Sequence, residues 1–536
     1  MKITLFIISV FIILPISISA QMLLSNQEKV ILQTDRNFFI AGENILFIAK
    51  YLNTDSSRNS KILYVDLISS EPEWIRGKKY RISDFNVSGS FKISENIKTG
   101  FYFLRAYSNS MRNLGQQNFA IIPLKIVNPF SEEVISQNIT LSKSDTDTNN
   151  FTNEISISIN NSDIAKDSIL EIEINAKNIS ANNDFCLSII PELAQQNINF
   201  QLVKSDKSKD FLMEDVGIAI SGIVINKLTK LPIPSTTICL SILGSSDLIF
   251  ANSDSIGQFN FNLTDNFGNQ EIFVSLMDSN LANQAEIKIN NDFSFAETIN
   301  VQAFTLSDEE KNLALILSKN LQLTDVFKEK STTREKFQQQ FYGKADETIN
   351  LLDYVGLNFL REYFTEISSS VNLKYHNKKP YFTINSTNPQ LQFIPTLILL
   401  DYAPVYDLEK LLKLSTSKIN RIEIVNDIYV KGEFMFGGIL NIITNNYDFA
   451  NFEFPKSSIF VNYEMLHEEN LNKYETFDDK MPDYRNTILW QPKIAPKFPY
   501  KTTFKKPSAS GKYLIIFKSV SDRKPYFEKT LEFYVD

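Results

Sequence analysis

The sequence is poor in the side chains that most enzymes use as bases, nucleophiles and metal ligands, because it holds two histidines and two cysteines in 536 residues. His467 begins the run His-Glu-Glu-Asn-Leu, in which Leu471 stands where a zinc-binding H-E-x-x-H helix carries its second histidine. His376 lies in a polar stretch of Lys, Asn and Tyr. One ligand does not hold a catalytic zinc, so the histidines predict no metal site.

Other patterns that carry chemistry are absent or incomplete in the sequence. It has no Gly-x-Ser-x-Gly elbow, no phosphate-binding glycine-rich loop and no dinucleotide fingerprint. Asp145 opens an alternation of oxygen-bearing side chains like the start of a calcium loop, but Asn150 and Ser156 stand where that loop needs Gly and Glu. We therefore predict a protein that is not an enzyme and uses no cofactor or metal. An enzyme with an unrecognised site is the least favoured alternative.

The cysteines, Cys186 and Cys239, each begin the tetrapeptide Cys-Leu-Ser-Ile within an alternating apolar stretch. A small buried thiol is common in such a strand, so two separate core thiols are the favoured interpretation. The alternative is a disulfide between them, which requires Cα atoms within about 7 Å of each other.

Length and composition predict several folded domains that are mainly β. The chain is 43% hydrophobic and 22% charged, and at about 100–200 residues per domain it is long enough for several separate cores. The 42 Phe and 21 Tyr residues favour pleated sheets. The net charge of -8, without a basic block, argues against nucleic acid as a partner.

The first twenty residues predict export. A short positive start is followed by an almost unbroken apolar run and then by Ser19-Ala20, so residues 1–20 have the pattern of a cleaved signal peptide. A membrane anchor is the minority interpretation, because Pro15 interrupts a run that is already short for a span. No later run is apolar and long enough for a transmembrane helix, so we expect a mature chain in the periplasm or at the cell surface.

The first half of the mature chain predicts β-sandwiches. Residues 25–129 and 151–215 show short alternating strands separated by turns. The runs 34–43 and 100–107 resemble the macroglobulin-type domain of exported Bacteroidota proteins, and 151–215 resemble a second, weaker copy. Asp35 and Arg36 are expected to shape the turn before the second strand. Both cysteines lack the Cys-Gly-Glu-Gln context of protease-trapping macroglobulins, which excludes covalent trapping.

Two further segments follow these sandwiches. Residues 216–293, with Ser221-Gly222, Leu231-Pro232 and a hairpin turn at Gly257, resemble the carboxypeptidase regulatory-like domain, which is a small transthyretin-like sandwich without a catalytic group. Residues 305–345 predict a connector that begins with a helix capped at Ser307, because acidic residues fill its first turn and leucines recur at helical spacing.

Residues 346–446 predict a small α+β domain. A short apolar strand ends in Asp401, a helix follows over 407–414, a second strand begins at Arg421, and Gly437-Gly438 precede the last strand. This order resembles the plug domain of TonB-dependent outer-membrane receptors, although Tyr402 stands where that family usually has Gly and the turn must be built differently. The resemblance implies a possible partner-binding role for Asp401, Tyr402, Arg421, Gly437 and Gly438.

The expected function follows from what comes after the plug-like segment. A receptor barrel of about 22 strands would need several hundred residues, whereas residues 452–536 predict only another β-sandwich. We therefore expect a non-enzymatic envelope protein that binds or scaffolds and docks to an outer-membrane or other envelope protein through the plug-like segment. The alternative is carbohydrate or peptide binding by the sandwich faces, with Trp74 and Trp490 as the first candidates for stacking on a sugar.

Overall fold

The structure is a computed structural model of the chain. It describes residues 28–53, 59–135, 155–159, 169–177, 184–203, 211–244, 247–264, 266–278, 280–281, 283–327, 340–354, 356–386, 388–468, 482–495, 497–521 and 528–536. The predicted signal peptide, residues 1–20, and the run 145–150 lie outside the described residues. The described chain is mostly β and contains several domains, as the sequence predicts.

The first β-sandwich lies between Glu28 and Ile135. Its sheets have the strand orders β1-β3-β6 and β2-β8-β7-β4-β5-β30, and their inner faces pack large apolar side chains such as Phe47, Tyr80 and Leu104. The last strand of the larger sheet, β30, comes from the far end of the chain and runs parallel to β5. The strands are β1 Glu28–Thr34, β2 Phe38–Ile40, β3 Asn44–Asn53, β4 Ile62–Ser69, β5 Trp74–Arg81, β6 Asn86–Lys92, β7 Gly100–Tyr107, β8 Ala120–Val127 and β30 Leu466–His467.

A second sandwich is assembled from two distant parts of the chain. Its sheets have the orders β32-β10-β9 and β31-β11-β33-β34, so three early strands pair with four strands from the C-terminal end. The separate domains that we predicted for 151–215 and 452–536 are therefore wrong: the two segments complete one another. Three strands bury too little apolar surface to form a sandwich, and β33 supplies the missing neighbour of β11. The strands are β9 Ile155–Ile159, β10 Ile169–Ala176, β11 Asp184–Pro191, β31 Leu489–Ile494, β32 Tyr500–Lys505, β33 Gly511–Val520 and β34 Glu528–Val535.

The third sandwich occupies the segment that resembles a transthyretin-like domain. Its sheets have the orders β16-β13-β18 and β15-β14-β17-β29, and β29 again returns from the C-terminal side, beyond the limit of 293 that we predicted. The buried residues of this sandwich form one contact cluster with those of the first sandwich. The strands are β13 Ile218–Asn226, β14 Thr237–Ile242, β15 Asp247–Asn252, β16 Gln258–Leu263, β17 Asn269–Leu276, β18 Ala285–Ile289 and β29 Ile459–Glu464.

The helix α1, Asp308–Phe327, confirms the predicted cap. The hydroxyl of Ser307 accepts a hydrogen bond from the Glu310 amide at 3.2 Å, and the Glu310 carboxylate accepts one from the Ser307 amide at 2.7 Å. This reciprocal pair is a capping box. The apolar face of α1, with Leu313 and Leu317, packs on Phe38 of the first sandwich. Two short strands, β12 Phe200–Leu202 and β19 Ile299–Val301, pair ahead of the helix.

The α+β module, residues 340–458, contains a five-stranded sheet of order β20-β25-β28-β23-β24. The predicted strands at 395–401, 421–426 and 436–444 correspond to β23, β25 and β28, and the predicted helix over 407–414 corresponds to the shorter α3. Its elements are β20 Glu347–Asn350, α2 Leu360–Glu362, β21 Val371–His376, β22 Lys379–Ile384, β23 Leu397–Leu400, β24 Ala403–Pro404, α3 Leu408–Leu411, β25 Ile419–Val425, β26 Tyr429–Lys431, β27 Phe434–Phe436 and β28 Ile439–Thr444.

Single helical turns complete the secondary structure. They are η2 Ser110–Leu114, η3 Gln116–Asn118, η4 Glu192–Ala194, η5 Leu351–Asp353, η6 Tyr363–Ile367, η7 Pro389–Phe393, η8 Thr416–Lys418 and η9 Phe449–Asn451.

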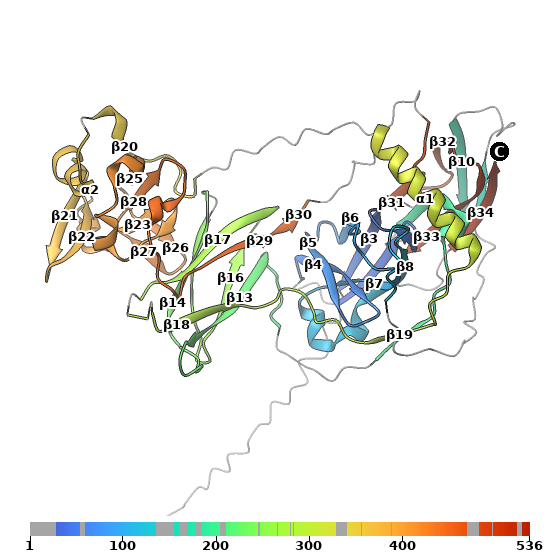
Figure 1. Cartoon of the computed structure of the whole chain (residues 1–536), viewed down its shortest axis with the longest axis horizontal. Helices are drawn as coiled ribbons and strands as arrows, with labels where there is room; N and C mark the ends of the chain where they lie inside the picture. The colour runs from blue at the N-terminus through green and yellow to red at the C-terminus, as the bar shows by residue number, and fades with distance from the viewer. Residues whose placement is uncertain are drawn as a thin grey trace, which may run out of the picture.

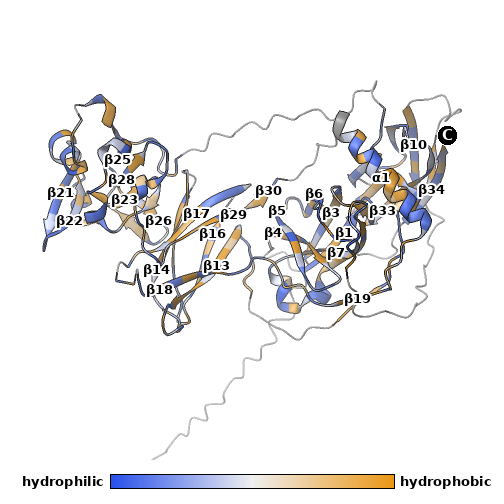
Figure 2. Cartoon of the chain, in the orientation of Figure 1, coloured by the Kyte–Doolittle hydropathy of each residue, from blue (hydrophilic) through white to orange (hydrophobic). Residues whose placement is uncertain are grey.

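The domains form an elongated arrangement, and after the α+β module the chain runs back along the molecule to the second sandwich (Figure 1). The α+β module lies at one end, beyond the third sandwich, and the second sandwich lies at the other end. Hydrophobic residues concentrate on the strands of the sandwiches and in the central strands of the α+β sheet (Figure 2). Among the helices that the structure describes, none has the length and apolar character needed to cross a membrane.

Candidate functional site

Asp401 and Tyr402, two of the predicted partner-binding residues, form a tight turn at the end of β23. Both have positive φ, 47° for Asp401 and 69° for Tyr402, so this turn adopts the left-handed conformation without glycine. The Asp401 carboxylate accepts hydrogen bonds from the amide and hydroxyl of Thr444, at 2.7 and 2.6 Å, and from the Phe449 amide at 2.9 Å. These hydrogen bonds offset part of the backbone strain. Asp401 is 3% exposed, so its carboxylate holds the turn together and offers little surface to a partner.

Gly437 and Gly438 are required by close packing of the backbone. A Cβ on Gly437 would lie 2.4 Å from the carbonyl oxygen of Leu391, and one on Gly438 would lie 2.6 Å from that of Val425. Gly438 also has a φ of 90°. The two glycines let the chain enter β28 beside its neighbours, a structural explanation that needs no partner.

Arg421 belongs to a partly buried polar group that we call the Glu423 cluster, formed by Gln340, Tyr342, Tyr402, Arg421 and Glu423. The Arg421 Nε donates to Glu423 Oε1 at 2.7 Å, and the hydroxyl of Tyr342 also donates to the Glu423 carboxylate. The Gln340 amide donates to the Tyr402 hydroxyl at 3.1 Å. Burial, together with the neighbouring Glu423 carboxylate, raises the pKa of Tyr342 well above its usual range, so its hydroxyl stays protonated.

One side of the α+β module is held against the third sandwich. Apolar side chains from both parts form one buried cluster, listed here: Cys239, Leu248, Leu397, Leu399, Phe436 and Ile439. Polar contacts surround it: the Ser241 hydroxyl donates to the Tyr402 carbonyl at 2.7 Å, and Lys431 Nζ lies 2.6 Å from an Asp247 carboxylate oxygen. The Tyr402 backbone therefore contacts this chain's own third sandwich.

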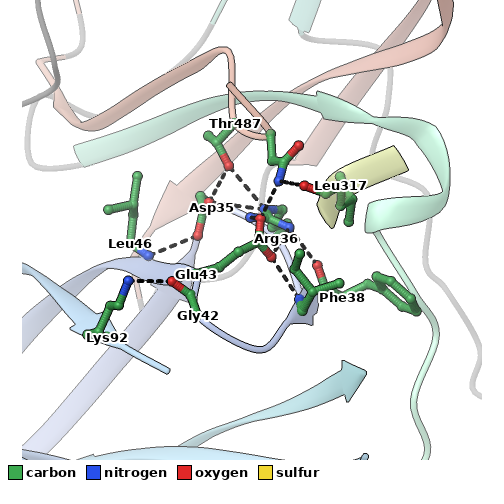
Figure 3. Close-up of polar contacts among 11 residues, drawn as sticks. Asp35, Arg36, Phe38, Gly42, Glu43, Leu46, Lys92, Leu317 and Thr487 are labelled. Atoms are coloured by element: carbon green, nitrogen blue, oxygen red, sulfur yellow. Dashed lines mark hydrogen bonds and ion pairs between the residues drawn. The ribbon is translucent and has the colours of Figure 1, made fainter. Parts of the chain in front are cut away.

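A second polar constellation, the junction cluster, joins three parts of the molecule (Figure 3). It comprises Asp35, Arg36 and Glu43 of the first sandwich and Asn486 and Thr487 of the segment that leads into the second. The Arg36 guanidinium binds both carboxylate oxygens of Glu43, at 2.6 and 3.1 Å. The Asn486 amide bridges the Glu43 carboxylate at 2.6 Å and the carbonyl of Leu317 in α1 at 2.9 Å.

Asp35 completes the junction cluster. Its carboxylate accepts from the Leu46 amide at 3.0 Å and from the Thr487 hydroxyl, while Arg36 lies beside it. Burial raises the pKa of Asp35 to about 6, although the Arg36 charge and the two hydrogen bonds lower it. From the sequence we predicted only that Asp35 and Arg36 shape a turn. Their contacts with Asn486 and Thr487 were not predicted, because no local pattern encodes a contact across so many residues.

A third polar group joins the first and third sandwiches around Glu214. Its Oε1 accepts from the Tyr64 hydroxyl at 2.9 Å and from the Ala219 amide at 2.8 Å. Nearby, the buried Lys79 Nζ lies 2.8 Å from an Asp292 carboxylate oxygen. Burial raises the pKa of Glu214 to about 7, so in the folded protein this carboxyl is mostly protonated below neutral pH and about half ionised near pH 7.

This pKa predicts a pH-dependent stability that Glu214→Gln removes. A carboxyl whose folded pKa lies above its ordinary value stabilises the fold at low pH, and the stabilisation is lost as pH rises from about 4.5 to about 7. Between pH 5 and pH 8, the free energy of unfolding of the wild type should therefore fall relative to that of Glu214→Gln by about 2–3 kcal/mol.

Chemical denaturation at the two pH values measures this difference, and parallel stabilities of wild type and Glu214→Gln would contradict it. As a control, Glu133→Gln removes an exposed carboxyl and should change the free energy of unfolding by less than about 0.5 kcal/mol at either pH.

The remaining candidates from the sequence are placed as follows. Cys186 and Cys239 are free and buried in different contact clusters, so the alternative of a disulfide between them is wrong. Trp490 is 4% exposed beside Cys186, whereas Trp74 is 40% exposed with its ring centroid 5.3 Å from that of Phe293. Only Trp74 therefore presents part of its ring to solvent.

The His, Cys, Asp and Glu side chains do not gather into a metal centre in the described part of the chain. His467 Nε2 lies 2.9 Å from Glu464, and His376 is exposed near the tip of the β21–β22 hairpin. Within the described ranges, no group of three or more His, Cys, Asp or Glu side chains is placed to share a metal ion. In both the Glu423 cluster and the junction cluster the charged groups face one another, but the Glu423 cluster lies within the α+β module, whereas the junction cluster joins the first sandwich to the segment that leads into the second.

The chain was compared with known proteins. No family model and no curated protein matches it. Among solved structures, it is similar to Escherichia coli alpha-2-macroglobulin activated by trypsin, at 6% identity over 94% of this chain and 41% of that one, with a TM-score of 0.23. The native form of the same protein gives 7% identity over 95% and 40%, with a TM-score of 0.24.

A third similar structure is dimeric latent PorU from Porphyromonas gingivalis, at 10% identity over 52% of this chain and 34% of that one, with a TM-score of 0.16. The chain spans less than half the length of each of these proteins.

Proposed function

We propose that the protein is a non-enzymatic scaffold of the cell envelope, in which the sandwiches form a rigid support and the plug-like α+β module docks to an outer-membrane or other envelope protein. The observation that carries this proposal is the way the module is mounted. One side is fixed to the third sandwich by the apolar cluster around Phe436, and its other end lies at the tip of the elongated molecule (Figure 1).

Exposed apolar side chains on the module support the docking role. Leu352 is 89% exposed and Phe393 is 83% exposed, although both belong to short turns whose neighbours Leu351 and Leu391 are buried. Single exposed apolar side chains are common on protein surfaces, and where a partner covers them they can serve as anchors of an interface. The signal-peptide pattern of residues 1–20 and the resemblances to exported Bacteroidota proteins and to receptor plugs are predictions from the sequence, and they are the reason why we propose a partner in the envelope.

The three junctions support the scaffold role. The junction cluster, the Glu214 group and the apolar cluster around Phe436 each replace a simple linker by a buried contact between domains. The chain also crosses between domains on its return path, because β29 and β30 complete sheets in the third and first sandwiches. Multiple crossings of this kind restrict domain motion, as a support that holds a docking module at a fixed distance requires.

Affinity capture tests the docking proposal. The tagged protein is purified from gently solubilised envelopes of its native host, and the captured proteins are compared with those of Leu352→Ser/Phe393→Ser. We expect the wild type to recover an outer-membrane protein in stoichiometric amount and the double variant to recover at least about tenfold less, as loss of two interface anchors predicts.

The matched control is Leu228→Ser/Phe130→Ser, which removes two equally exposed apolar side chains, at 90% and 74% exposure, from the third and first sandwiches. It should recover the partner like the wild type. Equal recovery by the double variant of the module, or equal loss in the control, would contradict docking through the module.

Carbohydrate or peptide binding by the sandwich faces is the second candidate. The half-exposed Trp74 is the observation that favours it, since an open indole face can stack on a sugar ring. A glycan array probed with wild type and Trp74→Ala distinguishes it from docking, because that substitution leaves the module unchanged.

A further inference from the structure

The β21–β22 hairpin of the α+β module projects beyond the core of the module. At its base, Val371 pairs with Ile384, and both are buried at about 2% exposure or less, whereas at its tip His376 pairs with Lys379 and is exposed. Tyr375, one residue before the tip, is 59% exposed. The hairpin lies at the far end of the long axis of the molecule (Figure 1). With about 3.3 Å per residue, its free end extends roughly 10 Å past the buried part.

The free end has two different faces. Directly opposite residues of a hairpin share a face, and successive residues alternate between faces. The register therefore places Tyr375 and Pro380 on the face that continues from the buried Val371 and Phe382. The other face carries Lys374, His376, Lys379 and Tyr381.

The turn holds this arrangement in place. Asn377 and Lys378 have φ values of 50° and 65°, the conformation of a type I′ turn, which matches the twist of the two strands. Lys378 is thereby presented at the end of the hairpin, next to Lys379. The two-residue turn leaves few alternative conformations, so the aromatic and basic groups are preorganised.

The charge of this region is opposite to that of the whole chain. From Ile367 to Leu400 the sequence contains no Asp or Glu, whereas the whole chain has a net charge of -8. Among the ion pairs of the described residues, none involves Lys374, Lys378 or Lys379. The three ammonium groups are therefore free to meet a negatively charged surface.

We propose that this hairpin binds the surface of a bilayer that contains anionic phospholipid. Tyrosine side chains favour the interface between lipid and water, where the ring contacts acyl chains and the hydroxyl stays hydrated. Each lysine near such a surface strengthens binding by about fivefold. A stable protein interface buries about 800 Å² per partner and involves about 20–30 residues, which the convex tip of one hairpin does not provide.

This proposal goes beyond docking to an envelope protein, because it requires lipid alone. It would orient the molecule with the α+β module on the membrane and the sandwiches standing away from it. The exposed Leu352 and Phe393, which belong to other turns of the module, would then remain for the protein partner.

Vesicle co-sedimentation tests the proposal. The protein without residues 1–20, whose apolar run would itself bind lipid, is mixed with vesicles of phosphatidylcholine alone or with about 30% phosphatidylglycerol. We expect binding only to the anionic vesicles, and its loss as salt rises from about 50 mM to about 500 mM. Lys374→Gln/Lys378→Gln/Lys379→Gln should lower the partition coefficient on the order of 100-fold, and Tyr375→Ser should lower it several-fold.

The matched control is Lys413→Gln/Lys418→Gln/Lys456→Gln, which removes three exposed lysines from the same module. It should bind the anionic vesicles to within about threefold of the wild type, since lysines away from the surface contribute little beyond a Debye length. Absence of binding by the wild type, equal binding to neutral vesicles, or an equal loss in the control would overturn the proposal. Affinity capture with the hairpin variants distinguishes this proposal from docking to a protein. The variants should still recover the protein partner, because docking rests on Leu352 and Phe393.

Discussion

Replacement of Arg36 by Met is expected to destabilise the protein by about 3–5 kcal/mol, because it leaves two buried carboxylates without their cation. Arg36 is 3% exposed, it contacts both oxygens of Glu43, and its guanidinium also lies 4.3 Å from the centre of the Phe39 ring. Glu43 in turn holds Asn486, which binds α1. The substitution should therefore lower the melting temperature of the unit that contains the first sandwich, as measured by scanning calorimetry.

An exposed arginine provides the control for this experiment. The Arg76 side chain is 49% exposed and lies 3.8 Å from Glu464, so Arg76→Met should cost less than about 1 kcal/mol. If Arg36→Met and Arg76→Met lower the melting temperature equally, the junction cluster does not contribute to stability in the way its geometry implies.

Gly438→Ala is expected to destabilise the α+β module by about 3–5 kcal/mol, through two effects that act together. The added Cβ would lie 2.6 Å from the Val425 carbonyl oxygen, which cannot move without disturbing β25. The φ of 90° is also unfavourable for any residue with a Cβ. Limited proteolysis should show the module cleaved while the sandwiches stay intact, and the variant should lose capture of the partner.

Two other glycines separate the effects. Gly432 has a φ of 60° and open space around it, so Gly432→Ala should cost only about 1 kcal/mol for the backbone conformation. Gly356 has neither restriction, and Gly356→Ala should be neutral within about 0.5 kcal/mol. A Gly438→Ala protein as resistant to protease as Gly356→Ala would show that β28 tolerates a side chain there.

Local structure could be predicted from the sequence where it depends on neighbouring residues. The prediction of β-structure over 452–536 covers β33, and the Ser307 cap predicted the start of α1, because these signals lie within one element. The sequence pattern singled out Asp401 and Gly437-Gly438 as possible partner-binding residues. In the structure, the Asp401 carboxylate closes a turn, and the two glycines allow close packing of the backbone.

The arrangement of the domains could not be predicted in this way. Any suitable neighbouring strand could pair with the backbone of β11 and cover its apolar side chains. Nothing within the sequence of β11 specifies β33 as its partner. The contact between Asp35 and Thr487 has the same origin, since it joins residues from opposite ends of the chain. Pairing between distant segments is decided by the whole set of buried surfaces, so the sequence suggested two small sandwiches where the chain builds one.

The central claim, that the α+β module docks to an envelope protein through its exposed end, is tested most directly by site-specific photo-crosslinking in the native host. A benzophenone side chain replaces Phe393 of the module or, as the control, Phe130 of the first sandwich, which is similarly exposed. We predict one discrete adduct with an envelope protein from position 393 and none from position 130. The same adducts from both positions, or an adduct from position 130 alone, would contradict the claim.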